Sequence, residues 1–323
     1  MGARVIITVT LNAAIDKTLE VPSFTPGRRH RSVDQTTMPG GKGVNIARAI
    51  KRLGQPVIAT GLAGGATGAR IIEALDSESI LNDFVRIEDE SRTNTAVMDP
   101  TTGVHTEINE RGPAVAPAEL EQFHEKLVYL AQGASICVFA GSIPRGVSPD
   151  IYATLIRDVR RLGVTTMIDS EGEPLRLSMR AEPDLVSPNE LEAEELVGHE
   201  FNDADERAGA VAEMVRLGAH EAIMTVPDGC FARIDDGDGP AIYRVTVEEQ
   251  EARSAVGSGD AFLAGYVAAR YGHSSPVDCL RFGVACGAES TQHFGAGIIE
   301  PGRVERLLGV VESERLAVGA QIG

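Results

Sequence analysis

One carboxylate in the sequence stands at a corner of the chain where it could do chemistry. In "AVGSGDAF", residues 255–262, Asp260 directly follows Gly257, Ser258 and Gly259 and precedes an apolar run typical of a helix. The glycines allow the backbone to turn its N–H groups inward, and the start of a helix carries partial positive charge. Together these features predict a site for an anion with an acid at its edge.

An aspartate at the edge of an anion site can act as a general base. It can accept a proton from a substrate hydroxyl while the backbone N–H groups neutralise a phosphoryl group in transit. Phosphoryl transfer has a loose transition state, so positioning and charge neutralisation matter more than a strong base. We expect the helix end to keep Asp260 ionised at neutral pH. The alternative is a plain N-cap, because Asp is a favoured capping residue.

A second glycine corner is "PGGKGVN" at 39–45. It combines backbone N–H groups with a cation, Lys42, and a side-chain amide, Asn45, just inside a predicted helix. Alone, this pattern favours a simple tight turn. A third corner, "LAGGATG" at 62–68, is interpreted as a strand-to-helix turn without a ligand. None of the three corners is a Walker A loop or a complete G-x-G-x-x-G dinucleotide motif.

The elements that must position these corners alternate between helix and strand patterns from about residue 43 onward. The phrase "RLG" closes a helical pattern three times, at 52–54, 161–163 and 216–218. Arg suits a helix C-terminus, and Gly suits the left-handed residue beyond it. Apolar runs typical of buried strands lie at 56–64, 135–141, 164–170 and 221–227. The alternation predicts an α/β fold, with a Rossmann-like, mostly parallel sheet sandwiched by helices.

Two segments depart from this alternation, at about 12–38 and 91–110. Both alternate polar with apolar residues and contain turn sequences, which predicts hairpins. Together they could form a small β-sheet lid over the carboxyl ends of the core strands, where such folds bind ligands. Residues 230–247 are a third predicted hairpin, within the core. We find no linker and expect a single domain over 1–323.

The composition narrows the range of partners. With 47 acidic and 30 basic residues the formal charge is −17, which repels nucleic acid and anionic membranes. An anionic substrate would therefore be held by a few well-placed cations or backbone N–H groups. The cysteines form no C-x-x-C pair and the histidines no H-E-x-x-H motif, so neither a disulfide framework nor a zinc site is indicated. No signal peptide or membrane-spanning run is recognised, and we expect a cytoplasmic protein.

Seven motifs in one order give a resemblance to a known family. They are "TLNAAIDKTLEV", "PGGKGVNIARAIKRLG", "TEINERGP", "FAGSIPRGV", "IDSEGEPL", "SPNELEAEELVG" and "VGSGDAFLAG". With them the chain resembles the PfkB (ribokinase-like) carbohydrate kinases from about residue 6 to about residue 300. It is most similar to the phosphosugar branch, the 1-phosphofructokinases and tagatose-6-phosphate kinases. The resemblance implies a ribokinase-like fold and an ATP- and Mg²⁺-dependent transfer of the γ-phosphoryl group to a hydroxyl of a sugar phosphate.

The resemblance also implies roles for individual residues. Asp260 matches the family's catalytic base, and Gly257, Ser258 and Gly259 match its anion hole. The sugar-binding positions are Asp16, Gly40, Gly41, Lys42 and Asn45, with Arg92 binding the phosphate already on the substrate and Arg28 a second candidate for that role. The nucleotide-binding positions are Asn189, Thr225, Asp228 and Gly229. Asn189 and Glu192 form the N-x-x-E pattern that orders magnesium and its waters.

Four of the charged residues also have plain interpretations. Asp16 could cap a turn, Arg92 could form a surface ion pair, and Glu192 could belong to a solvated helix face. Arg145 lies in a turn after a predicted strand and could face either solvent or the active site.

The sequence departs from the family pattern in four places. Ser187 stands where many relatives have Lys, and "TVPDG" stands where they have a Ser/Thr-Leu-Gly nucleotide turn. Ala255 replaces Thr ahead of the anion hole, and Ser258 replaces Ala within it. The backbone donors are kept, so these departures affect mainly the expected adenosine side.

These observations favour a kinase of fructose 1-phosphate, with tagatose 6-phosphate or fructose 6-phosphate as alternative substrates. Lys42 and Arg92 beside a sugar corner suit a substrate that already bears phosphate. The altered nucleotide turn leaves open a non-catalytic sensor that binds sugar phosphate or nucleotide. A ribose or nucleoside kinase is disfavoured, because those substrates need no paired cations. We expect a homodimer, because pairing two lids would cover their exposed strand edges.

Overall fold

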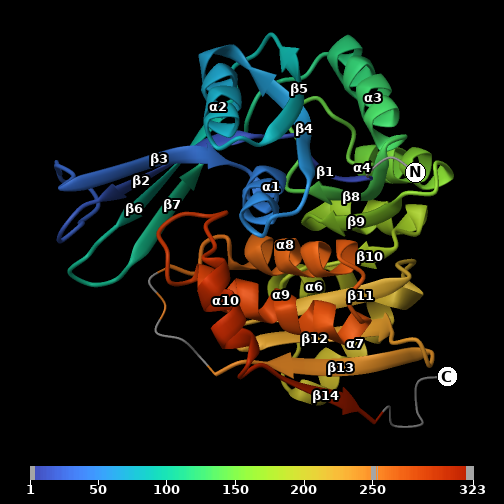
Figure 1. Ribbon diagram of the computed structural model, residues 1–323. Coiled ribbons are helices and arrows are strands. Elements are labelled where there is room, and N and C mark those ends of the chain that lie inside the picture. Colours follow the sequence, from blue (N-terminus) through green and yellow to red (C-terminus); the bar gives the residue numbers. More distant parts are fainter. Residues whose placement is uncertain (1–3, 249–251, 253, 318–323) are drawn as a thin grey trace.

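A large twisted sheet runs through the molecule (Figure 1). The computed structural model describes residues 4–248, 252 and 254–317. Within these residues ten strands form this sheet, in the order β14 (Glu312–Leu316), β13 (Pro240–Thr246), β12 (Gly229–Asp235), β11 (Glu221–Val226), β10 (Leu185–Val186), β9 (Thr165–Asp169), β8 (Ala134–Ala140), β1 (Val5–Thr10), β4 (Val57–Gly64) and β5 (Leu81–Ile87). From β11 to β5 all neighbours are parallel. Of the nine pairings in this sheet only β11 with β12, β12 with β13 and β13 with β14 are antiparallel, so the predicted mostly parallel sheet is confirmed.

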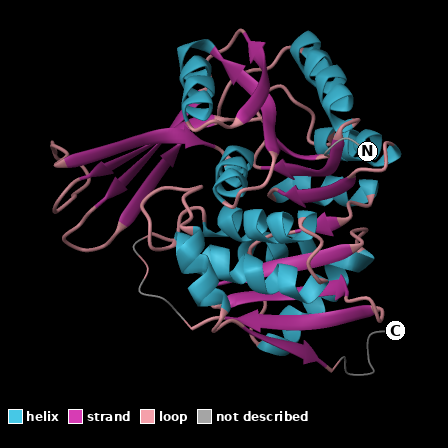
Figure 2. Cartoon of the chain, viewed as in Figure 1, coloured by secondary structure: helices cyan, strands magenta, loops and turns pink. Residues whose placement is uncertain are grey.

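Helices cover both faces of this sheet (Figure 2). One face carries α1 (Lys42–Arg52), α2 (Gly65–Ser77), α8 (Ser258–Tyr271), α9 (Pro276–Ser290) and α10 (Pro301–Leu308). The other carries α3 (Pro117–Ala131), α4 (Ile151–Arg161), α5 (Gly172–Ser178), the short 3₁₀ helix η1 (Met179–Ala181), α6 (Glu190–Val197) and α7 (Ala204–Arg216). Along β8, Val138 packs into the first layer and Phe139 into the second. A strand buried on both faces needs such a continuous apolar run.

The three "RLG" phrases close helices as predicted. α1, α4 and α7 end at Arg52, Arg161 and Arg216. The predicted turn at 62–68 is also confirmed, because β4 passes directly into α2 there. None of the helices in the described part of the chain is both long enough and apolar enough to cross a membrane.

A second, smaller sheet projects from the core at the left of Figure 1. Its order is β3 (Asp34–Gly40), β2 (Ala14–Glu20), β6 (Arg92–Met98) and β7 (His105–Asn109). Two antiparallel hairpins, β2 with β3 and β6 with β7, are joined by parallel pairing of β2 with β6. The two segments predicted to form a small sheet therefore do so, and we call this sheet the lid. The third predicted hairpin is β12 with β13.

Candidate active site

The first turn of α8 forms the glycine corner. Gly257 is the N-cap residue, with a left-handed φ of 81°, and Ser258, Gly259 and Asp260 form the first helical turn. A Cβ atom on Gly257 would lie 2.4 Å from the Cβ of Ala296, so both the backbone angle and the neighbour require glycine. Asp260 lies three residues inside the cap and its side chain makes no capping bond. The plain N-cap interpretation of Asp260 was therefore wrong.

The carboxylate of Asp260 is buried and hydrogen-bonded. Only 6% of the residue is exposed, and its Oδ2 accepts a hydrogen bond of 2.8 Å from Nδ2 of Asn45. Burial, followed by the charge of Asp169, raises the pKa of Asp260 to about 7, although Lys42 and Asn45 act to lower it. The expectation that the helix end keeps Asp260 ionised at neutral pH does not hold, because desolvation by burial is the largest influence on its pKa and places that pKa near neutral pH.

A cavity of about 290 Å³, which we call the polar cavity because most of its lining residues are polar or charged, is lined by Asn45, the hydrogen-bond partner of Asp260. Asp260 itself does not belong to its described lining. The cavity lining includes Asp16, Gly41, Lys42, Asn45, Arg92 and Asn94. Oδ1 of Asp16 accepts a hydrogen bond of 2.9 Å from Nδ2 of Asn94. The buried Oδ1 atoms of Asn45 and Asn94 have no hydrogen-bond partner among the described residues. Buried acceptors without partners are costly, and the hydroxyl groups of a sugar would supply the missing donors.

The lid and the glycine corner at 39–45 meet at this cavity. Asp16 lies on β2 opposite the end of β3, and a Cβ on Gly40 would overlap its carboxylate at 1.9 Å. Gly40 therefore makes room for Asp16, whose pKa is raised by burial, against the lowering effect of its hydrogen bond from Asn94. The turn-capping interpretation of Asp16 does not hold, because the residue lies within a strand.

Arg92 borders the same cavity without a carboxylate partner. Its Nε and Nη1 donate to the carbonyl oxygens of Asn12 and Glu110, both at 3.1 Å. Within the described residues no carboxylate lies at ion-pair distance from it, so it is not the surface ion pair considered above. Arg28 is exposed in the loop between β2 and β3 and does not belong to the described lining of the cavity.

Lys42 connects the sugar corner to two further carboxylates. Its Nζ lies 2.7 Å from Oδ1 of Asp169, at the end of β9, and 2.9 Å from Oε1 of Glu192, on α6. Burial acts to lower the pKa of Lys42, but the nearby carboxylates outweigh it and raise the pKa. Glu192 is only 11% exposed in its side chain, so the solvated-face interpretation of this residue was wrong.

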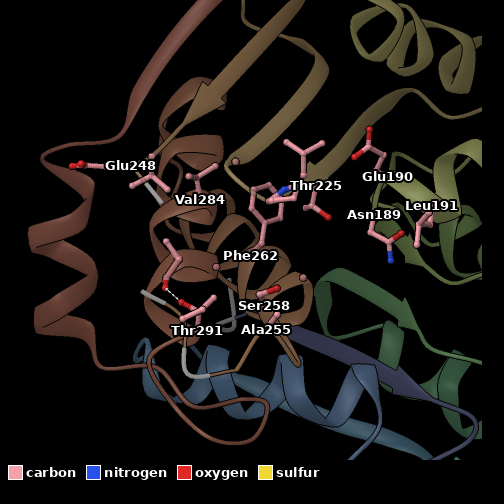
Figure 3. A pocket seen from close by; sticks show the side chains of 18 residues that line it. Asn189, Glu190, Leu191, Thr225, Glu248, Ala255, Ser258, Phe262, Val284 and Thr291 are labelled. Atoms are coloured by element: carbon pink, nitrogen blue, oxygen red, sulfur yellow. Dashed lines mark hydrogen bonds between the residues drawn. The ribbon is translucent and has the colours of Figure 1, made fainter. Parts of the chain in front are cut away.

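A second cleft, of about 460 Å³, is lined by Ser258, Gly259 and Phe262 of α8 (Figure 3). In Figure 3 Ser258, Phe262 and Val284 line one side of it, and Asn189 and Leu191 lie across from them. Among the residues expected at the nucleotide, Asn189, Thr225 and Gly229 line this cleft. Of the expected anion hole, Ser258 and Gly259 line it and Gly257 does not belong to its described lining. Asp228 does not belong to its described lining, since its carboxylate pairs with Arg244 of the β12–β13 hairpin.

The residues expected to bind magnesium form a capping box at the start of α6. Oδ1 of Asn189 accepts from the amide of Glu192, and Oε2 of Glu192 accepts from the amide of Asn189, both at 2.9 Å. The described residues contain no group of three or more metal-ligating side chains. One carboxylate and one amide oxygen fit an ion held mainly by nucleotide phosphates and water, which is how Mg²⁺ often binds.

Two residues of the site were missed by sequence reasoning. Asp169 was quoted only within a motif, although an acid at the carboxyl end of a predicted strand is a recognisable signal. Asn94 stands two residues after Arg92 on the same lid strand, and period-two alternation places both side chains on one face. Asp169 is bound by Lys42, and Asn94 donates a hydrogen bond to Asp16. Both of these partners were predicted from the sequence.

The geometry is thus a buried carboxylate whose hydrogen-bond partner, Asn45, lines the polar cavity, and whose neighbours Ser258 and Gly259 line the larger cleft. The comparison with known proteins shows the family. Residues 7–302 match the pfkB family carbohydrate kinases. The chain belongs to this family. It is therefore a phosphotransferase that acts on sugar hydroxyls, with ATP as the donor that the family implies.

Similar individual proteins cover nearly the whole chain. A 1-phosphofructokinase of Borreliella burgdorferi is 32% identical, over 87% of this chain and 90% of that protein. A tagatose-6-phosphate kinase of Staphylococcus epidermidis is 28% identical, over 95% of this chain and 98% of that protein. Among solved structures, the tetrameric inhibited form of phosphofructokinase-2 from Escherichia coli matches with a TM-score of 0.86 and 28% identity, over 95% of this chain and 98% of that chain. The ribokinase-like fold is shown by these matches.

Proposed function

We propose that the protein transfers the γ-phosphoryl group of ATP to a hydroxyl of a ketohexose phosphate, with fructose 1-phosphate as the preferred substrate. The observation that carries this proposal is the position of Asp260. Asn45, which holds its carboxylate, lines the polar cavity, and Ser258 and Gly259, which precede it in α8, line the larger cleft. A sugar in the first space and a nucleotide in the second would meet at Asp260.

Each residue then has a chemical task. Asp260 accepts the proton of the attacking hydroxyl as the oxygen forms its bond to phosphorus. The amide of Ser258 already donates to the carbonyl of Ala255 at 3.2 Å. The amides of Gly259 and Asp260, which have no acceptor within their own helix, would face the charge on the transferred group. Asp16, Asn45 and Asn94 orient the sugar hydroxyls in the cavity. Bound Mg²⁺ would neutralise charge on the nucleotide phosphates, with Asn189 and Glu192 as its protein-side donors.

Burial of Asp260 suits this task. A general base is most effective when its pKa lies near the operating pH, and burial raises the pKa of Asp260 to about 7. Its hydrogen bond from Asn45 fixes the Oδ2 atom. Among the described residues no hydrogen bond to the other carboxylate oxygen, Oδ1, is found, and this atom would accept the proton of the substrate.

The substrate is tested by a coupled assay of ADP release with fructose 1-phosphate, fructose 6-phosphate, tagatose 6-phosphate, fructose and ribose. We expect the highest kcat/KM with fructose 1-phosphate. A higher kcat/KM with tagatose 6-phosphate or fructose 6-phosphate would change the preferred substrate but not the type of reaction. If no ADP is released with any of these sugars but a sugar phosphate still binds, the proposed kinase activity would be rejected in favour of a non-catalytic sensor.

We also propose a homodimer formed through the lid. β3 and β7 are the edge strands of the lid sheet, and Ile108 on β7 is 63% exposed, as are large parts of Val33 and Val104 in the adjoining loops. Pairing with a second lid would cover these edges and apolar side chains. Light scattering at micromolar concentration should give twice the monomer mass, and the Ile108→Glu variant should shift toward monomer. A monomeric wild type would contradict the proposal.

A further inference from the structure

A third space, a pocket of about 360 Å³, has Arg92 in its lining. Three arginines from three separate segments line it: Arg92 at the start of β6, Arg111 after β7, and Arg145 in the turn after β8. The sequence did not show whether Arg145 faces solvent or the active site. The structure places it against this pocket, with its side chain 56% exposed.

The positive charges around this pocket are incompletely paired. Arg92 donates to two neutral carbonyl groups, and the side chain of Arg111 makes no hydrogen bond or ion pair within the described residues. Arg145 donates Nε to the carbonyl of Gly112 at 2.9 Å and has one ion pair, of 3.2 Å, with Asp89. Arg92 is partly buried, whereas Arg111 and Arg145 are exposed to solvent, so an anion that enters the pocket would meet three guanidinium groups, two of which have no carboxylate partner among the described residues.

The carboxylates near the pocket are already bound to backbone amides. Glu90 accepts from the amides of Ala66 and Thr67 at the start of α2. Glu110 accepts from the amide of Thr93, at 2.9 Å. Asp89 accepts from the amide of Ala114 as well as from Arg145. These acids therefore stabilise the surrounding loops, and two of the three arginines remain without a carboxylate partner.

Arg92 also connects this pocket to the sugar cavity, because it lines both spaces. In a ketohexose 1-phosphate the phosphate and the C6 hydroxyl are at opposite ends of the carbon chain. A sugar whose free end lies at Asp260 would point its phosphorylated end away from that residue. We propose that Arg111 and Arg145, together with Arg92, bind the phosphate group that the substrate already carries, and so determine the preference for phosphorylated sugars. This inference rests on the proposed function and extends it.

The contribution of each arginine follows from the chemistry of phosphate binding. A guanidinium group can donate two parallel hydrogen bonds to phosphate oxygens, which fixes orientation as well as charge. Arg111 and Arg145 come from the core side of the site, not from the lid strands. The phosphate would therefore be held between the lid residue Arg92 and the core, which favours a closed lid only with a phosphorylated substrate.

The test compares Arg111→Gln and Arg145→Gln with Arg157→Gln, an exposed arginine on α4 that serves as the matched control. The readout is the ratio of kcat/KM for fructose 1-phosphate to kcat/KM for fructose. Each pocket variant should lower this ratio about ten-fold or more, as expected for one charge-assisted hydrogen bond. The control should leave both the ratio and the activity unchanged. An unchanged ratio in both pocket variants would overturn the proposal.

A further measurement separates this proposal from the proposed function and from misfolding. Equilibrium dialysis with labelled inorganic phosphate needs no turnover: weaker binding by both Gln variants than by the control supports the pocket even if no sugar is phosphorylated, and equal binding overturns it. Arg145 also holds the carbonyl of Gly112 and Asp89, so Arg145→Lys is included. Arg145→Lys keeps the positive charge and should recover part of the lost preference for fructose 1-phosphate over fructose. If Arg145 had only a structural role, this variant would not restore the preference selectively.

Discussion

The side-chain amide of Asn45 donates a 2.8 Å hydrogen bond to Oδ2 of Asp260, and so joins the first turn of α1 to the first turn of α8. The two residues are separated by 215 positions in the sequence. Asn45 thereby fixes the position of this carboxylate, and the same residue lines the polar cavity with its buried Oδ1 unpaired among the described residues. Under the proposed function, one side chain would serve both the substrate and the group that removes its proton.

Replacement of Asp260 by Asn should separate binding from turnover. Asn keeps the shape of the side chain but cannot accept the proton, so kcat should fall by about 10² to 10⁴. Binding of ATP and sugar phosphate, measured by shifts of the unfolding temperature, should be largely retained. Near-normal turnover would remove Asp260 from the role of base.

The same variant should be more stable than the wild type above neutral pH. Because the pKa of Asp260 is raised from 3.8 to about 7, the folded protein binds more protons than the unfolded chain between these values. The aspartate therefore lowers stability as pH rises through this window, by up to about 4 kcal/mol, with the full penalty above it. Denaturant unfolding at pH 8 and pH 4 checks this: the advantage of Asp260→Asn should be present at pH 8 and small at pH 4.

The pH dependence of turnover should report the same group. The active form of Asp260 is ionised, so kcat should rise with pH and level off above about 7. Asn45→Ala removes a hydrogen bond that lowers the pKa of Asp260, so the midpoint should move to higher pH. A midpoint that stays in place or falls would show that another group controls the profile.

Two glycines of the α8 corner form a matched pair. Gly257→Ala should reduce the free energy of unfolding by about 1–3 kcal/mol, because it combines a strained positive φ with a contact to Ala296. At Gly259 a Cβ would meet no atom within 4 Å, so Gly259→Ala should change stability little. Its methyl group would instead occupy the nucleotide cleft and raise the KM for ATP. Equal losses of stability in the two variants would contradict this distinction.

Removal of the cation at Lys42 should leave two carboxylates facing each other. Lys42→Met breaks the contacts to Asp169 and Glu192, with a loss of about 3 kcal/mol, as for other buried pairs with one partner removed. The loss should be smaller at pH 5 than at pH 8, because protonation relieves the repulsion. Lys42→Arg should recover part of the stability. Denaturant unfolding at both pH values gives the comparison.

Glu192→Gln tests the expected magnesium site without disturbing the helix. Gln is accepted at this position of a capping box, but it removes the charge that pairs with Lys42 at 2.9 Å, so the free energy of unfolding should fall by about 1–3 kcal/mol. Loss of the carboxylate should raise the concentration of free Mg²⁺ needed for half-maximal turnover. Titration of Mg²⁺ at saturating ATP measures this, and an unchanged midpoint would assign the ion to other donors.

The fold and the glycine corners could be predicted because their signals are local. Apolar runs marked β4, β8, β9 and β11, and glycines marked the turns into α1 and α8. The ion pair of Lys42 with Asp169 joins residues 127 positions apart, and no local pattern encodes it. The raised pKa of Asp260 depends on how completely other elements bury it, which composition and spacing do not determine.

The predictions for Asp228 and Arg145 also fell short because they depend on contacts between segments that are distant in the sequence. Asp228 was expected at the nucleotide because of its place in a turn, but the facing strand of the hairpin supplies Arg244 as its partner. Arg145 was ambiguous because its neighbours in space, Arg92 and Arg111, come from segments more than 30 residues away along the chain. In both cases the sequence gives the charge, and tertiary packing decides which charges meet.

The lid strand β3 ends at Gly40 and α1 starts at Lys42, so the single residue Gly41 separates the two. A tilt of the lid that this residue does not absorb would be passed on to the helix that carries Asn45, the hydrogen-bond partner of Asp260. If Asp260 is the base that we propose, a sugar that leaves the lid displaced would also leave the base poorly aligned. Substrate selection and readiness for reaction would then be a single event.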